Sequence, residues 1–334
     1  MLTLDEFAQQ RLGDETLVAE LRRLLPKIEK EEALLPTRLE LWREVYMMRP
    51  REVNSSYLIW RYLSDFFKAR GYDLYVPCRD PVSDTLVDGA AYPADYMAAI
   101  GHAQDAFPVD AFGILGSRRY VCSFFPYAAV WAAKNSSGNE FVVKAVSDGQ
   151  NAKGLNELRI LEFLAREDVR GDSRNHTVPV VEFIRYEQYV FAIFPRWSGF
   201  PESDIKTPRT AIECCSQITE GIAFLHEKRI GHLDISIENF VINFFGISLP
   251  PLAPVVEHLP IRYGIIDFGE SVFFDAASEQ LAPDAPKLLA PPRDYCPRPT
   301  SAPEVGSQQP FDPFAADVYQ TGMFILEQFY VRTR

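Results

Sequence analysis

The chain has 334 residues, of which 47% are apolar, and its formal net charge at pH 7 is −12. This length suffices for one large two-lobed domain or two modest ones, and the apolar fraction is that of an ordinary globular protein. The negative charge argues against general affinity for nucleic acid or for anionic membrane surfaces. We therefore expect neither a nucleic-acid partner nor a membrane partner.

The cysteines and the N-terminal residues favour an intracellular protein. Five cysteines, an odd number without metal-type spacing, are typical of reduced thiols. Cys214 and Cys215 lie in a helical pattern, where they are expected to pack as small hydrophobes. The N-terminal residues MLTLDEFAQQ lack the basic and apolar regions of a signal peptide, and no uncharged apolar run is long enough to span a bilayer. We expect a cytoplasmic location, with the nucleus as the open alternative.

The N-terminal part of the chain has a helical pattern. Apolar residues recur at helical spacing from Leu17 to Leu25, and Pro26 is expected to end this first helix. A second helix is expected at residues 37–48. A third is expected to begin in the capping cluster at residues 54–56 and to end before Gly71, which suits a helix C-terminus.

After these helices, residues 72–112 carry no assignable pattern, and near residue 110 the sequence changes to short β-type runs. The expected elements are strands at 121–125, 128–133, 140–146 and 189–194, helices at 151–166 and 208–226, an extended Pro- and Ala-rich segment at 274–313, and a last helix from about residue 315. The change of pattern divides a helical N-terminal extension, residues 1–110, from a second domain, residues 111–334. The extension could be a docking or dimerisation module, or a layer packed on the second domain.

Two motifs in the second domain carry the chemistry. Residues 232–239 read HLDISIEN, and residues 267–269 read DFG. Together they resemble the protein-kinase superfamily, whose catalytic loop reads H-R-D-x-x-x-x-N and whose metal-binding motif is D-F-G. The resemblance implies that Asp234 accepts the proton of the substrate hydroxyl, and that Asn239 and Asp267 bind Mg²⁺ on the phosphates of ATP. Apolar strands beside Asn239 and Asp267 are expected to pair as a hairpin that delivers both to one metal site.

Upstream residues extend the resemblance. Val142-Val143-Lys144 stands where the family has V-A-I-K, and Glu157 shares the apolar face of the following helix. A buried carboxylate needs a partner, and the resemblance implies that Glu157 pairs with Lys144, which would hold the phosphates beside Val142. The alternative is an ordinary surface lysine and glutamate.

Further positions match the family pattern. Pro195 and Trp197 stand at the expected hinge, where the resemblance implies backbone contacts with adenine. Residues 302–304 match A-P-E, and Asp317 lies in a segment similar to the D-x-W-x-x-G opening of the central helix. The resemblance implies that Asp317 accepts hydrogen bonds from the catalytic-loop backbone, and that His232 is a packed structural histidine.

The implied fold is α+β. It is a protein-kinase-like two-lobed fold with a β-rich N-lobe at about 111–196, a mainly helical and incomplete C-lobe at about 197–334, and the N-terminal helical extension. Long intervals between the motifs are similar to those of divergent kinase-like proteins in mushroom-forming fungi. The implied cofactors are ATP and Mg²⁺, and the implied substrate is an unidentified protein.

Four departures from the family pattern bear on activity. The segment before the Lys144 strand has no glycine-rich loop, so the backbone cannot approach phosphates as closely. Leu233 replaces an arginine that normally meets a phosphorylated activation segment, which makes such phosphorylation a poor candidate for the switch. Ser236 replaces a lysine that neutralises the transferred phosphate. The sequence stops at Arg334, soon after the Asp317 helix begins, and is expected to be C-terminally truncated.

The sequence is therefore compatible with three functions. The first is a protein kinase that phosphorylates serine or threonine, since all five implied nucleotide-handling groups are present. The second is a pseudokinase or nucleotide-binding scaffold that acts by binding partner proteins, which the missing glycines and lysine favour. The third is a small-molecule kinase, against which the motifs at 302–304 and Asp317 argue.

Overall fold

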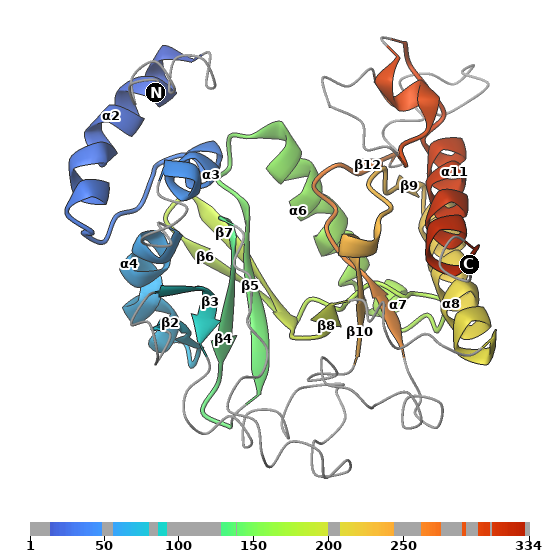
Figure 1. The fold of residues 1–334 in the computed structure, drawn as a ribbon, viewed down its shortest axis with the longest axis horizontal. Helices are drawn as coiled ribbons and strands as arrows, with labels where there is room; N and C mark the ends of the chain where they lie inside the picture. Colours follow the sequence, from blue (N-terminus) through green and yellow to red (C-terminus); the bar gives the residue numbers. More distant parts are fainter. Residues whose placement is uncertain are drawn as a thin grey trace. The chain divides into compact units, whose positions relative to one another are not determined.

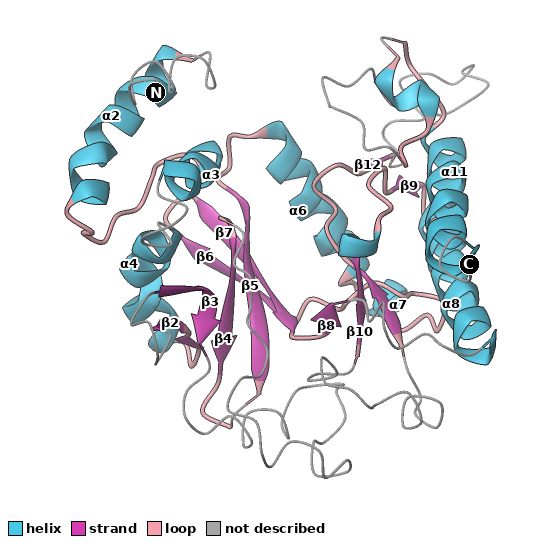
Figure 2. Cartoon of the chain, in the orientation of Figure 1, coloured by secondary structure: helices cyan, strands magenta, loops and turns pink. Residues whose placement is uncertain are grey.

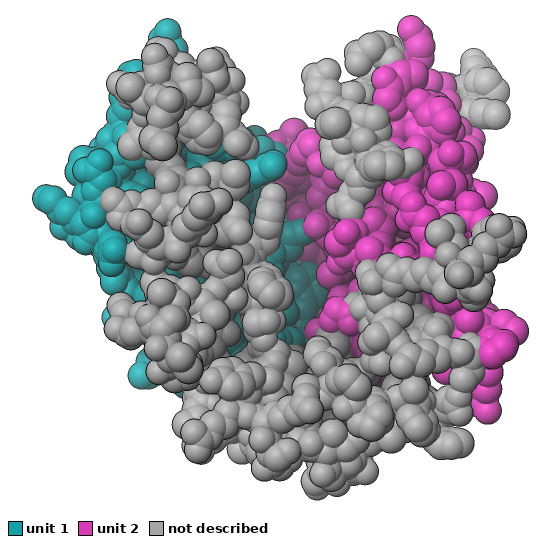
Figure 3. Space-filling model, in the orientation of Figure 1, with its two compact units in different colours: residues 1–151, 181–196 teal, residues 152–180, 197–334 magenta. Residues whose placement is uncertain are grey.

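The computed structural model describes residues 14–48, 56–79, 86–91, 128–137, 139–199, 208–243, 262–274, 289–291, 300–307 and 309–330. The chain combines helices with antiparallel strands, which is an α+β fold (Figures 1 and 2). It divides into two compact units (Figure 3). Unit 1 comprises residues 1–151 and 181–196, and unit 2 comprises residues 152–180 and 197–334. The predicted domain boundary near residue 110 lies outside the described residues.

Unit 1 is built on a curled antiparallel sheet of five strands in the order β1-β4-β5-β7-β6. The strands are β1 (Asp73–Leu74), β4 (Val130–Lys134), β5 (Glu140–Ser147), β6 (Glu182–Tyr186) and β7 (Tyr189–Pro195). A separate pair joins β2 (Val76–Arg79) to β3 (Leu86–Ala91). The predicted strands at 128–133, 140–146 and 189–194 are confirmed as β4, β5 and β7, whereas β1, β2 and β3 fall where no pattern was assigned.

The N-terminal helices share one hydrophobic core with this sheet. They are α2 (Glu15–Glu29), α3 (Leu39–Met48) and α4 (Ser56–Lys68). The indole of Trp60 on α4 lies 5.4 Å from that of Trp42 on α3 and 5.9 Å from that of Trp131 on β4, and all three are fully buried. Such large aromatic contacts dominate a core energetically. The described helices therefore form a layer on the sheet, one of the two arrangements considered for them.

Helix α2 does not end at Pro26, as the sequence predicted, but continues to Glu29 with the proline inside it. Proline fixes φ at a helical value and removes one N–H donor, which is a tolerable loss when the residues around it are well packed. Leu24 and Ile28 on either side are almost completely buried. Gly71, by contrast, behaves as predicted: its φ of +87° lies in the left-handed region that favours glycine just after α4.

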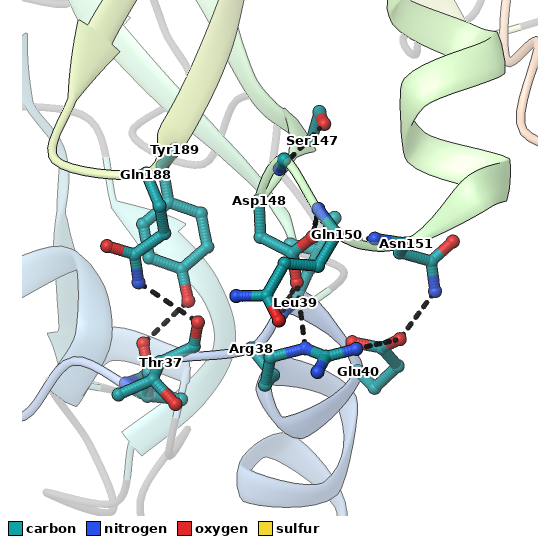
Figure 4. Close-up of polar contacts among 12 residues, drawn as sticks. Thr37, Arg38, Leu39, Glu40, Ser147, Asp148, Gln150, Asn151, Gln188 and Tyr189 are labelled. Atoms are coloured by element: carbon teal, nitrogen blue, oxygen red, sulfur yellow. Dashed lines mark hydrogen bonds and ion pairs between the residues drawn. The ribbon is translucent and has the colours of Figure 1, made fainter.

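Asp148 ties the start of α3 to the loop after β5. Its buried carboxylate accepts hydrogen bonds from the backbone N–H of Leu39 at 2.8 Å and from those of Gln150 and Asn151 at 3.0 Å (Figure 4). The Asn151 side chain in turn donates to Glu40 at 2.6 Å. One carboxylate thus caps the first turn of α3 from a distant part of the chain and also orders the loop that leads to the next helix.

The pKa of Asp148 makes this cap sensitive to acid. Burial alone would raise the pKa of the carboxyl, but the hydrogen bonds from Leu39, Asn151 and Gln150, together with Arg38, outweigh it and bring the pKa below its ordinary value. Near that pKa the folded state therefore binds fewer protons than the unfolded chain. The stabilisation by Asp148 is complete above about pH 4 and is lost as the pH falls through the pKa of Asp148 in the folded state.

We expect Asp148→Asn to lower the free energy of unfolding by about 2 kcal/mol at pH 7, because an amide leaves one of the buried N–H donors without an acceptor. Urea unfolding of both proteins between pH 7 and pH 3 measures this difference, which should shrink below about pH 4. Asp168→Asn, at an exposed carboxylate, is the control and should change little. A difference between wild type and Asp148→Asn that is equally large at pH 3 would contradict the assignment.

Unit 2 contains the remaining described elements, drawn from green through red in Figure 1. Its helices are α6 (Ala152–Leu164), α7 (Glu167–Arg170), α8 (Pro208–Glu227) and α11 (Pro313–Ile325), with short helical turns η2 (Ile237–Asn239), η3 (Pro303–Gly306) and η4 (Leu326–Tyr330). Its strands are β8 (Ser198–Gly199), β9 (Ile230–Gly231), β10 (Phe240–Ile242), β11 (Tyr263–Ile265) and β12 (Val272–Phe273).

The main helices of unit 2 follow the sequence prediction. Helix α6 matches the predicted helix 151–166, α8 matches 208–226, and α11 begins two residues before the expected start, where Asp312 caps it by accepting from the backbone N–H of Phe314 and Ala315. Cys214 on α8 is fully buried, as expected, whereas Cys215 is only partly buried. Burial raises the pKa of the Cys214 thiol well above the ordinary value. Among the described residues, no helix has the length and apolar character needed to cross a membrane.

Candidate functional site

The backbone of residues 232–235 is held by side chains of α11. The Oδ2 atom of Asp317 accepts from the N–H of His232 and its Oδ1 atom from the N–H of Leu233, both at 2.7 Å. The Nε2 atom of His226 lies 2.9 Å from the same Oδ2. Asp317 is completely buried. The predicted hydrogen bonds between Asp317 and this backbone are confirmed.

Gln320 adds a contact that the sequence analysis missed. One helical turn beyond Asp317, its Oε1 atom accepts from the N–H of Ile235 at 3.1 Å. Residues three apart share a helix face, so the position of Gln320 three residues after Asp317 was the sequence signal for this contact. The two side chains accept from three backbone N–H groups on either side of Asp234, those of His232, Leu233 and Ile235, and leave little freedom in this loop.

His232 is a packed structural histidine, as predicted. Its side chain is fully buried, and the ring lies 5.2 Å from that of Phe268. Its Nε2 atom is 3.0 Å from the carbonyl oxygen of Ile266, and its Nδ1 atom accepts from the N–H of Asp234 at 3.3 Å. A carbonyl only accepts, so Nε2 carries the hydrogen and Nδ1 carries none. The neutral ring thereby joins the loop of Asp234 to the strand end before Asp267.

Asn239 is oriented by Asp234. Its Nδ2 atom donates to Oδ2 of Asp234 and to the Asp234 carbonyl oxygen, both at 2.8 Å. A carboxylate can only accept, so the amide nitrogen must face Asp234 and the amide oxygen must face the other way. The spacing of five residues in the motif therefore produces a carboxylate beside a fixed amide, whose oxygen is the atom suited to a hard cation.

A β-hairpin brings Asp267 next to Asn239. Strands β10 and β11 pair antiparallel with Phe240 opposite Ile265, and the N–H of Ile266 donates to the Asn239 carbonyl at 3.1 Å. The predicted pairing of these two strands is confirmed. Asp267 follows at once, with a φ of +67° that non-glycine residues rarely adopt, and its Oδ1 accepts from the N–H of Gly269 at 3.2 Å. Strained backbone of this kind clusters at functional sites.

Glu157 reaches the same region from α6. Its side chain is 5% exposed, and a Cβ placed on Gly269 would lie 3.2 Å from Oδ1 of Asp267 and 3.7 Å from Oε2 of Glu157. A side chain at Gly269 would therefore crowd the Asp267 carboxylate, and the Glu157 carboxylate lies at ordinary contact distance from the same point. Within unit 2, Glu157 and Asp267 both lie near Gly269, while Asn239 is bonded to Asp234 and to the residue before Asp267.

The other predicted residues are distributed between the two units. Val142 and Lys144 lie on β5 in unit 1, and their side chains are half-buried on the face opposite the buried Phe141, Val143 and Ala145, as strand alternation requires. Pro195 ends β7 in unit 1. The predicted pairing of Lys144 with Glu157 links residues of different units and stays a prediction.

Trp197 belongs to unit 2 and packs on Gly264. Its indole is 7% exposed, and a Cβ on Gly264 would lie 2.7 Å from the Cζ3 atom of Trp197. The guanidinium of Arg262 lies 5.9 Å from the ring centroid. The indole is therefore part of the core of unit 2. The adenine contact predicted at Trp197 involves its backbone and not its ring. The segment at 121–127, where a glycine-rich loop is missing from the sequence, lies outside the described residues.

The donor chemistry of Asn239 and Asp267 fits magnesium. Mg²⁺ is usually bound through one or two protein oxygen ligands together with substrate phosphates, rather than by an all-protein cage. An amide oxygen and a carboxylate on neighbouring strand ends match that requirement. Among the described residues no group of three or more His, Cys, Asp or Glu side chains is arranged to hold a metal ion alone.

Comparison with known proteins supports a kinase-like relationship. No protein-family model matches the chain. The chain is 25% identical over 147 residues to serine/threonine-protein kinase ppk8 of Schizosaccharomyces pombe (strain 972), and the match covers 44% of this chain and 23% of that kinase. The chain thus matches less than a quarter of the length of this curated relative.

Proposed function

We propose that this protein is a protein kinase that transfers the γ-phosphate of ATP to a serine or threonine hydroxyl of a protein. The observation that carries the proposal is the fixed Asp234–Asn239 pair, placed by the β10–β11 hairpin beside Asp267. Phosphoryl transfer depends mainly on positioning and charge neutralisation, and this arrangement supplies a proton acceptor next to two oxygen ligands. The similarity to a named serine/threonine kinase adds support.

Each residue has a role in the proposal. Asp234 would orient the acceptor hydroxyl and take its proton, while the backbone bonds from Asp317 and Gln320 keep Asp234 in place. The Asn239 amide oxygen and Asp267 would hold Mg²⁺, which when bound neutralises charge on the phosphates. In the two-lobed arrangement that the resemblance implies, Lys144 paired with Glu157 would orient the phosphates. The backbone near Pro195 and Trp197, with Val142, would meet adenine.

Nucleotide binding is the first test. ATP·Mg²⁺ at about 100 times its dissociation constant should stabilise the wild type by about 2.7 kcal/mol, seen as a rise in melting temperature of a few degrees. Lys144→Ala and Asp267→Asn should remove most of this rise. Lys134→Ala, on the neighbouring strand β4, is the matched control and should keep it. A well-folded wild type without any rise at millimolar ATP·Mg²⁺ would contradict the proposal.

A nucleotide-binding scaffold is the second candidate. Ser236 stands where the family has a lysine for the transferred phosphate, and its side chain is 7% exposed. A buried hydroxyl cannot neutralise that charge. Binding of ATP without phosphorylation of a peptide library would favour this function, and phosphorylation of small alcohols or amines instead of peptides would favour a small-molecule kinase.

A further inference from the structure

The segment that follows Gly269 forms the short strand β12, whose two edges have different hydrogen-bond partners. Strand β12 pairs antiparallel with β9, with Val272 opposite Gly231, and the N–H of Phe274 donates to the Arg229 carbonyl at 3.1 Å. Backbone groups alternate in direction along a strand, so those of Val272 and Phe274 face β9. The carbonyls of Ser271 and Phe273 consequently face the opposite edge.

Helix α6 supplies donors to that opposite edge. The Nδ2 atom of Asn156 donates to the Ser271 carbonyl at 2.9 Å, and Nη2 of Arg159 donates to the Phe273 carbonyl at 2.7 Å. Both contacts are side chain to backbone, so they hold the path of the chain and not merely one side chain. A strand this short needs such partners on both edges to stay ordered.

Two more contacts extend the same helix face. Lys153 lies 2.7 Å from the carboxylate of Glu270, and the ring of Phe163 lies 5.0 Å from that of Phe273. The four α6 side chains are spaced by three or four residues, which places them on one face of the helix: Lys153, Asn156, Arg159 and Phe163.

A second anchor lies beside Asp234. Leu233 is 1% exposed and forms an apolar cluster with Ala290, Ala302, Val305, Phe311 and Ala316, against which Val272 packs. Its φ of +64° is costly for leucine, so the surrounding packing must hold it. The cluster joins the loop of Asp234 to the parts of residues 289–311 that the structure describes. The position where the kinase resemblance places an arginine is thus filled by a buried apolar side chain.

We propose that the α6 face and the Leu233 cluster lock the described residues after Asp267, 270–274 and 302–305, in place without phosphorylation. In a phosphorylation switch, such a segment becomes ordered when a phosphate pairs with arginine. Leucine cannot bind a phosphate, whereas the apolar cluster and the two side-chain-to-backbone bonds order the segment permanently. Asn156 and Arg159 are then positioning residues, and only the consequence for catalysis rests on the proposed kinase function.

Hydrogen exchange of the backbone amides at 270–274, followed by mass spectrometry, tests the lock directly. Asn156→Asp removes the donor at unchanged size, and we expect it to speed exchange of these amides about tenfold, with a similar effect for Arg159→Ala. Arg159→Lys keeps a donor and should restore most of the protection. Leu155→Ala, on an exposed position of α6, is the control and should exchange like the wild type.

Phosphatase treatment supplies the second arm. Wild-type protein, shown by its intact mass to be free of phosphate, should keep full protection at 270–274. Loss of protection after dephosphorylation would overturn the lock, and so would wild-type exchange rates in both Asn156→Asp and Arg159→Ala. Leu233→Ala should speed exchange at residues 302–306, and unchanged exchange there would remove the second anchor.

The exchange experiment requires no nucleotide, so it separates the lock from the kinase proposal. If the exchange rates are as predicted but the protein does not bind ATP·Mg²⁺, the lock is supported and the kinase function is rejected. If peptide phosphorylation is observed, Asn156→Asp should lower kcat about tenfold with the KM for peptide changed less than about twofold. A kcat equal to that of the wild type would show that Asn156 does not position the reacting groups.

Discussion

Asp234→Asn is expected to lower phosphotransfer by about 10²–10⁴-fold, the range for removal of a positioned general base. The amide has the size and shape of the carboxylate, and its oxygen can still accept from Nδ2 of Asn239, which lies 2.8 Å from the carboxylate in the wild type. The loop should therefore keep its structure. Only the ability to take a proton from the acceptor hydroxyl is lost.

The measurement is single-turnover transfer of labelled phosphate from ATP to a peptide library, made with wild type and Asp234→Asn at saturating ATP·Mg²⁺. The thermal shift with ATP·Mg²⁺ should be equal for the two proteins, because the proposed metal ligands are Asn239 and Asp267. Asp168→Asn, which removes an exposed carboxylate elsewhere in unit 2, should transfer phosphate like the wild type. Equal rates for wild type and Asp234→Asn would reject the role assigned to Asp234.

Asp317→Asn should destabilise unit 2 by about 3–5 kcal/mol, because the two oxygens of Asp317 serve two backbone N–H groups and His226 in a fully buried site. An amide offers one acceptor in place of two and turns its own N–H groups toward a donor. Breaking a buried, hydrogen-bonded charge leaves the remaining groups without partners, which costs far more than the net value of any one bond.

Urea unfolding monitored by circular dichroism and tryptophan fluorescence measures this loss. Asp312→Ala is the control on the same helix: it removes an N-cap of α11 and should cost about 1 kcal/mol. A cost for Asp317→Asn no larger than that of Asp312→Ala would mean that α11 holds the loop through its packing alone. Such a result would also weaken the argument that Asp234 is rigidly positioned.

Several parts of this site could be located from sequence motifs and apolar runs. The kinase resemblance assigned the hydrogen bonds between Asp317 and the backbone beside Asp234, and two apolar runs predicted the pairing of β10 and β11; the structure contains both contacts. The two strands are short apolar runs, where periodicity restricts the backbone strongly, whereas Asp317 meets Leu233 across 84 residues and was found only through the kinase resemblance. The same local rule failed at Pro26, where packing around Leu24 and Ile28 outweighs a single lost hydrogen bond.

Most contacts between distant segments became visible only in the folded chain. The hydrogen bond from Leu39 to Asp148 joins residues 109 positions apart, and the one from Asn156 to Ser271 joins residues 115 apart. No periodicity or spacing links such positions, because Asp148 and Asn156 are ordinary polar residues in their own segments and their partners are backbone groups, which every residue carries. They are brought together by burial of the tryptophan-rich core in unit 1 and of the Leu233 cluster in unit 2. The hydrophobic effect that drives this burial is not directional, so the sequence pattern marks which residues are buried but not which segments they meet.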